Sequence, residues 1–93
     1  MTSYPIRFPK EIRPIRFERT EVLGMTVDYF FCREESHQYT VSVFCEDREE
    51  RLQEFTARPL VAEAFYLLLK EEGVLPGTAG ALWEDFAADL IGT

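Results

Sequence analysis

Apolar residues change their spacing along the chain at about Asp47. Before that point they alternate with polar residues over residues 25–31 and 39–45, as in half-buried strands. After it they recur every three or four positions, which is the spacing of helices. The helical positions are Val61, Phe65, Leu68, Leu82, Phe86 and Leu90. The pattern predicts an α+β fold, in which a three-stranded antiparallel β-meander precedes two helices packed on one face of the sheet.

Three strands are expected, over residues 15–22, 25–33 and 39–46, with Gly24 at the first turn. In one register the apolar members of the second and third strands share a face. That register pairs Phe31 with Val41, Tyr29 with Val43, and Val27 with Cys45. A slip of one residue would mix polar and apolar side chains, so the connecting loop should contain an odd number of residues.

Residues 47–54 form a charged bridge between the strands and the helices. Asp47 and Glu50 have the spacing of a capping box, which allows one or two helical turns. A solvated linker explains the same composition equally well.

The first helix should start near residue 57, with Thr56 as its N-cap and Pro59 in its first turn. It should end at Gly73 as a left-handed cap. After a short corner, Thr78 should cap a second helix that runs to about Ile91. The apolar stripes comprise Val61, Ala62, Phe65, Leu68 and Leu69 in the first helix and Leu82, Trp83, Phe86, Ala87 and Leu90 in the second.

The composition is that of a small globular protein with one domain. The 93 residues are 46% apolar and 14% aromatic. The net charge of −7 combines +2 over residues 1–33 (six basic, four acidic) with −9 over residues 34–93 (four basic, thirteen acidic). An acidic body disfavours binding to nucleic acid or to an anionic membrane. Two cysteines and the lack of a secretory or membrane-spanning pattern favour a cytoplasmic location.

The N-terminal segment is more basic and contains a short repeat, because residues 5–8 and 14–17 both read Pro-Ile-Arg-Phe. Basic residues fall at every third position. They are Arg7, Lys10, Arg13, Arg16 and Arg19. In a polyproline II conformation they would line one edge. The favoured alternative is an extended arm whose second repeat already belongs to the first strand. We therefore assign residues 1–13 to an N-terminal arm and residues 14–93 to a single α+β domain.

No combination of residues predicts a catalytic, cofactor or metal site. His37 is the only histidine and lies in an expected loop beside glutamates. Cys32 and Cys45 should face opposite sides of the sheet, with Cys45 in the core. Asp85 and Asp89 share a helical face and could contribute to a divalent-cation site, but a solvated acidic face is the better interpretation. We therefore expect neither an enzyme nor a cofactor.

The leading hypothesis is a non-enzymatic protein–protein interaction module with an unidentified protein partner. Its candidate interaction surface comprises Arg13, Arg16, Arg19, Trp83, Glu84 and Asp85, with the acidic residues pairing with the basic arm within one chain or between two copies. An open sheet edge predicts a homodimer. The alternatives are a small regulator that binds nucleic acid through the basic N-terminal segment and a carboxylate-dependent metal-binding protein.

The C-terminal half also resembles a known family. A Val-x-Pro corner at Val74 and Pro76 precedes a helix with Leu82 and an acidic pair followed by an aromatic residue, Glu84-Asp85-Phe86. This arrangement resembles a family of short bacterial proteins of unknown function from Gram-positive gut anaerobes. Gly77 and Gly80 stand where that family has polar residues, which would loosen the start of the second helix. The resemblance implies an α+β fold and a bacterial cytoplasmic setting, and it implies no activity.

Overall fold

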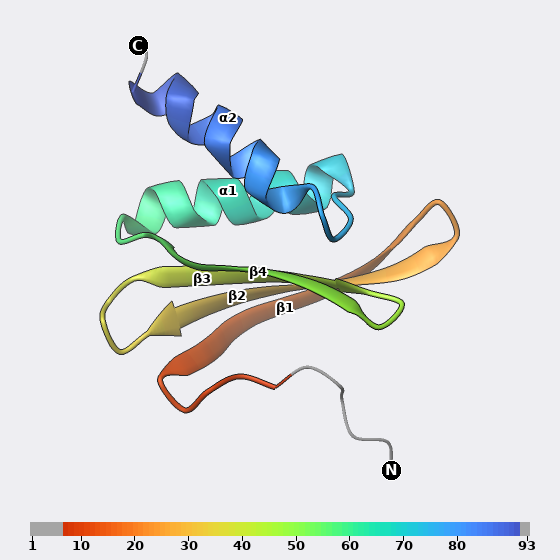
Figure 1. Ribbon diagram of the computed structural model, residues 1–93, viewed down its shortest axis with the longest axis horizontal. Coiled ribbons are helices and arrows are strands. Elements are labelled where there is room, and N and C mark those ends of the chain that lie inside the picture. Colours follow the sequence, from red (N-terminus) through yellow and green to blue (C-terminus); the bar gives the residue numbers. More distant parts are fainter. Residues whose placement is uncertain (1–6, 92–93) are drawn as a thin grey trace.

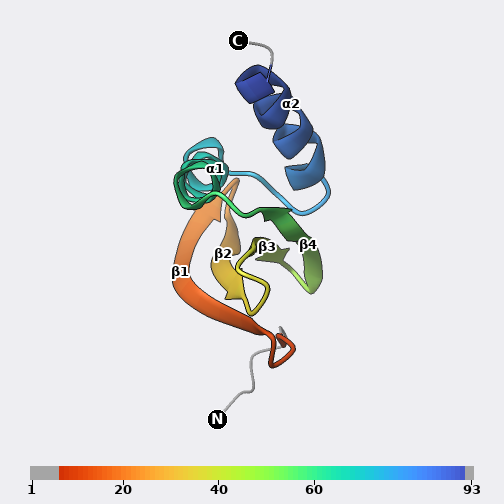
Figure 2. The same ribbon diagram turned by 90° about the vertical axis from the view of Figure 1, so that its left-hand side faces the viewer.

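The computed structural model describes residues 7–91, which form two layers. A four-stranded antiparallel sheet in the order β1-β2-β3-β4 carries two helices on one face (Figure 1). The elements are β1 (Ile12–Val22), β2 (Met25–Glu34), β3 (Tyr39–Cys45), β4 (Arg48–Thr56), α1 (Pro59–Glu72) and α2 (Ala79–Ile91). Figure 2 shows α1 lying next to the sheet and α2 rising away from it on the side of β4. The α+β class is confirmed, whereas the expected number of three strands is wrong.

The fourth strand, β4, occupies the segment that was expected to be a short helix or a solvated linker. Its residues pair with β3, with Leu52 opposite Val41 and Arg51 opposite Ser42. Six of its first seven residues are polar or charged, so the segment lacks the apolar alternation of a typical strand. Charged side chains are common on edge strands because they discourage pairing with other molecules. Asp47 caps no helix; with Glu46 it forms the two-residue turn into β4, both residues having positive φ.

The predicted register of β2 and β3 is confirmed. Phe31 lies opposite Val41, and Tyr29 lies opposite Val43. The backbone N–H of Glu34 donates to the carbonyl oxygen of Gln38 at 2.8 Å, which closes a three-residue loop. The odd loop length is therefore confirmed as well. Such a loop ends in a residue with positive φ, and here that residue is His37 (φ 69°) rather than glycine.

Strand β1 starts at Ile12, three residues earlier than expected, and contains an irregularity at Ile15. Pro14 is opposite Cys32 and Arg16 is opposite Phe31, so Ile15 is the extra residue of a bulge. The proline is tolerated because β1 is an edge strand. The second Pro-Ile-Arg-Phe repeat thus belongs to the first strand.

The main core lies between the sheet and the helices. Phe65 of α1 is fully buried, and its ring contacts the rings of Phe55, Trp83 and Phe86 at centroid distances of 5.5, 5.0 and 5.5 Å. The buried residues of α1 are Ala62, Phe65, Tyr66 and Leu69. Val61 and Leu68 are only partly buried, contrary to expectation, and Tyr66 completes the buried stripe in their place.

Two tyrosine hydroxyls tie this core together. The hydroxyl of Tyr66 donates to the carbonyl oxygen of Tyr29 at 3.2 Å. The hydroxyl of Tyr29 donates in turn to the carbonyl oxygen of Val74 at 2.9 Å, which holds the corner between the helices on the sheet. Both hydroxyls are therefore buried and satisfied.

The helix termini were predicted in part. Gly73 ends α1 with φ 61°, as expected, and its N–H donates to the carbonyl oxygens of Leu69 and Lys70. Neither expected N-cap side chain caps its helix. Arg58 is the N-cap residue of α1 and makes no side-chain capping bond, and Thr56 accepts from the Arg58 N–H just before the helix. The hydroxyl of Thr78 donates back to Leu75.

The side chain that caps α2 is Glu50, which lies 27 to 30 residues earlier in β4. Its carboxylate accepts hydrogen bonds from the N–H groups of Gly77, Ala79 and Gly80 at 2.7, 2.8 and 2.9 Å. A carboxylate in this place satisfies unpaired donors and interacts favourably with the positive end of the helix dipole. It also joins α2 to the sheet.

Replacing Glu50 with alanine should lower the free energy of unfolding by about 2 kcal/mol, because three N–H groups lose their acceptor. Trp83, the only tryptophan, lies in α2, so its fluorescence should shift to longer wavelength as the helix loosens. Glu50→Gln should lose less, since the amide oxygen can still accept. Glu84→Gln is the matched control because Glu84 is exposed on the same helix. Equal stability of Glu50→Ala and the wild type in urea titrations would contradict this role.

The second face of the sheet is covered by the start of the described chain. Phe8 packs with Ile12, Phe30, Cys32 and Phe44 in a second apolar cluster, and the segment before β1 runs beneath the sheet (Figure 1). Across the sheet, Arg51 of β4 lies 4.4 Å above the Phe8 ring and donates to the carbonyl oxygen of Arg7 at 3.0 Å.

Cys32 belongs to this second cluster and Cys45 to the main core, as expected from the register. Both thiols are free and buried. Within residues 7–91, neither helix has the length and apolar character that crossing a bilayer requires.

Candidate functional site

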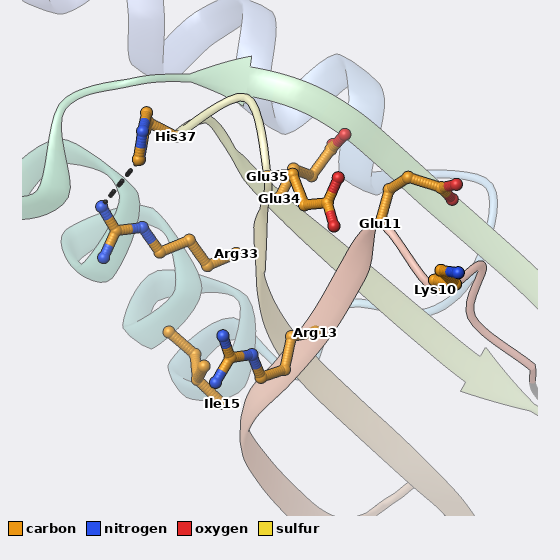
Figure 3. Close-up of a pocket in the computed structure, with 8 residues that line it drawn as sticks. All are labelled: Lys10, Glu11, Arg13, Ile15, Arg33, Glu34, Glu35 and His37. Atoms are coloured by element: carbon orange, nitrogen blue, oxygen red, sulfur yellow. Dashed lines mark hydrogen bonds between the residues drawn. The ribbon is translucent and has the colours of Figure 1, made fainter.

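A hollow of about 370 Å³ lies at the end of the sheet where β1 begins and β2 turns into β3 (Figure 3). Its volume is in the range of small-molecule pockets, about 300–1,000 Å³. The lining residues are Lys10, Glu11, Arg13, Ile15, Arg33, Glu34, Glu35 and His37. Of the residues singled out from the sequence, it contains Lys10, Arg13 and His37.

Strand pairing places two arginines side by side in this hollow. Arg13 of β1 lies directly opposite Arg33 of β2, so both side chains leave the sheet on the same face. The guanidinium group of Arg33 also lies 5.9 Å from the ring centroid of Tyr39, its partner on β3. Figure 3 shows both guanidinium groups on the same side as Ile15, whose residue surface is 52% exposed. The result is a pair of arginines with an apolar margin.

His37 lies next to this arginine pair. The Nη2 of Arg33 lies 3.3 Å from Nδ1 of His37. A guanidinium group can only donate, so Nδ1 accepts and the neutral ring carries its proton on Nε2. This tautomer leaves Nε2–H as a further donor next to the two arginines.

The acidic residues of the hollow form no ion pair with Arg13 or Arg33. Glu34 has the opposite orientation in β2, and its carboxylate accepts from the hydroxyl of Thr40 and from the N–H of Glu54. Among residues 7–91, neither Arg13 nor Arg33 forms an ion pair with a carboxylate. Like charges directly opposite on neighbouring strands are destabilising. The fold therefore maintains a local repulsion here.

Neither Cys32 nor His37 is placed for nucleophilic or general-base chemistry in this hollow. The nearest cysteine in the chain, Cys32, is fully buried and belongs to the cluster on the other face. Burial raises the pKa of its thiol to about 12, so the nucleophilic thiolate is disfavoured at neutral pH. His37 bonds to a cation rather than to a carboxylate that could orient it as a base.

The other predicted interaction residues are not gathered into one surface. Arg16 pairs with Glu18 at 2.9 Å and reaches Glu63 of α1 at 3.9 Å. Arg19 pairs with Asp28 at 2.7 Å. Within residues 7–91, neither of these two arginines forms an ion pair with Glu84 or Asp85. Both acidic residues lie exposed on α2.

The basic stripe with a three-residue period does not form between residues 13 and 19. In β1 the pairing partners put Arg16 on the helix side, opposite Phe31, and Arg19 on the other side, opposite Asp28. A strand alternates with period two, and the bulge at Ile15 shifts the alternation once. The polyproline II interpretation is therefore wrong for this part of the chain.

Trp83 is mainly a packing residue. Its ring lies 4.9 Å from that of Phe55 and 5.0 Å from that of Phe65, although the side chain remains partly exposed. Within residues 7–91, no group of three or more His, Cys, Asp or Glu side chains is arranged to hold a metal ion. The acidic pair of Asp85 and Asp89 therefore belongs to no such group.

A second surface, which the sequence analysis missed, is the outer side of α1. Leu60 and Ala64 are exposed and Leu67 is partly exposed, at the i, i+4, i+7 spacing of one helical side. Leu60 has 82% of its surface exposed. The sequence did indicate this surface, because Glu63 is the only charged residue between Pro59 and Leu69. A helical segment with apolar residues on nearly every side is normally buried against other parts of a protein.

Comparisons with protein-family models, with curated proteins and with solved structures find no match to this chain. The resemblance of the Val74–Pro76 corner and the following acidic pair to short proteins of Gram-positive anaerobes stays a prediction.

Proposed function

We propose that this protein is a non-enzymatic protein-interaction module whose partner is a second copy of the chain, bound through the outer side of α1. The observation that carries the proposal is the apolar stripe formed by Leu60, Ala64 and Leu67. An exposed apolar stripe on one side of a helix is typical of a protein interface.

The distribution of charge along α1 favours an antiparallel pair of such helices. Arg58 stands at the N-terminal end, and Glu71 and Glu72 occupy the last turn. All three are exposed. When two copies of α1 cross about a twofold axis, Arg58 of each copy faces the acidic last turn of the other. The antiparallel arrangement also opposes the two helix dipoles.

The helix side is a better interface than the sheet edges. Edge strand β1 carries Pro14 and a bulge, and edge strand β4 begins with Arg48-Glu49-Glu50-Arg51. Both features discourage strand addition. We therefore move the predicted homodimer from the sheet edge to α1.

The experiment is sedimentation equilibrium of the full chain and of matched variants. Leu60→Asp should weaken dimerisation at least about tenfold, because a carboxylate would be buried in an apolar contact. Leu23→Asp is the control, since Leu23 is 87% exposed in the turn before β2; it should dimerise as the wild type does. Arg58→Glu should weaken the dimer, and Arg58→Glu combined with Glu71→Arg should restore it. A wild-type monomer at high concentration, or a Leu60→Asp variant that dimerises normally, would refute the proposal.

A further inference from the structure

We infer that the Arg13–Arg33 pair is a binding site for an oxyanion, a phosphate or carboxylate group of a small molecule. The inference is independent of the dimer, because it concerns the hollow where β1 begins and β2 turns into β3, and none of the residues that line this hollow belongs to α1.

The first argument is electrostatic. Arg13 and Arg33 lie opposite each other on neighbouring strands, and in the described chain neither has a carboxylate as an ion-pair partner. Arg16 and Arg19, on the same strand, both have such partners. A bound anion would turn the repulsion between Arg13 and Arg33 into two attractive contacts.

The second argument is geometric. Guanidinium groups present parallel N–H donors that match the paired oxygens of phosphate and carboxylate. Arg33 is held in place by the Tyr39 ring and by Nδ1 of His37. The hydrogen bond to His37 uses one of the five N–H donors of Arg33 and leaves four. Nε2–H of His37 adds another donor at the edge of the site.

The third argument concerns the rest of the ligand. The hollow of about 370 Å³ is larger than a phosphate or carboxylate group alone needs. Exposed Ile15 beside Arg13 offers an apolar contact (Figure 3). Glu11 and Glu35 line the same hollow, so they disfavour ligands that carry several negative charges. The site thus fits a small molecule with one oxyanion group and an uncharged or cationic remainder.

The test compares inorganic phosphate and acetate with chloride at equal ionic strength, using the full-length protein. In the wild type, phosphate or acetate should shift the Nε–Hε signals of Arg13 and Arg33 in a saturable NMR titration and raise Tm, while chloride does neither. Preference for phosphate or for acetate identifies the group that is bound. In Arg13→Gln and Arg33→Gln the dissociation constant should rise at least about tenfold. Arg48→Gln, an exposed arginine at the start of β4, is the control and should bind normally.

The melting temperature of the variants without oxyanion gives a second test, in which the expected change has the opposite sign. Without oxyanion, Arg13→Gln should have a Tm equal to or above that of the wild type, because the repulsion is relieved. The inference is refuted if chloride shifts the signals as phosphate and acetate do, or if Arg13→Gln binds as tightly as the wild type. Sedimentation of the same samples separates this outcome from loss of the dimer, since the oxyanion variants leave Leu60 and Arg58 intact.

Discussion

Phe65→Ala is expected to lower the free energy of unfolding by roughly 3–5 kcal/mol, the usual cost of truncating a buried phenylalanine. Phe65 is fully buried and contacts aromatic rings from β4 and α2. Its removal leaves a cavity at the point where the sheet and both helices meet. A domain of this size has a total stability of about 5–15 kcal/mol, so the variant should be close to unfolding at moderate temperature.

Urea titrations followed by circular dichroism and by Trp83 fluorescence measure this effect at one fixed protein concentration. Phe65→Leu should lose less, because most of the volume is kept. Leu23→Ala is the matched control, since it removes a similar apolar side chain from the surface and should stay within about 0.5 kcal/mol of the wild type. A loss below about 1 kcal/mol for Phe65→Ala would mean that the helices do not close over the sheet through this residue.

The parts of the fold that were predicted correctly are those where burial sets a period. Tyr29 and Val43 are fully buried, and a slip of one residue would turn one of them away from the core. Strand β4 was missed because its position on the edge allows charge on both faces. It contributes to the core through only two side chains, Leu52 and Phe55. Their spacing of three residues imitates a helix, because an irregularity in the pairing with β3 intervenes.

The candidate sites depend on contacts that a local pattern does not contain. The pairing of Arg13 with Arg33 follows from the start of β1 and from the bulge at Ile15. A strand starting at residue 15 leaves Arg13 outside the sheet. The capping of α2 by Glu50 is likewise absent from any local pattern, since it links residues 27 to 30 positions apart. Sequence spacing identifies a polar residue as a candidate cap only when it is close to the helix start.

Alkaline pH should unfold the protein through its buried tyrosines and thiols. Burial raises the pKa of Tyr29 to about 12 and raises that of Tyr66 further. Burial also raises the pKa of the Cys32 thiol to about 12. In the unfolded chain these groups titrate at about 10 for tyrosine and about 8.5 for cysteine. Their contribution to stability is therefore complete below about pH 8.5 and is lost as the pH rises toward 12.

The expected loss is large because each group resists ionisation only in the folded state. A shift of one pKa unit corresponds to 1.36 kcal/mol, so by pH 12 Tyr29 accounts for about 3 kcal/mol and Cys32 for about 5 kcal/mol. Together they approach the total stability of a small domain. Urea titrations at successive pH values between 8 and 11 should show stability falling ever more steeply. Tyr29→Phe and Cys32→Ala lose some stability at neutral pH, but their decline above pH 9 should be shallower than that of the wild type. Parallel declines for all three proteins would show that ionisation of these two groups does not drive the unfolding.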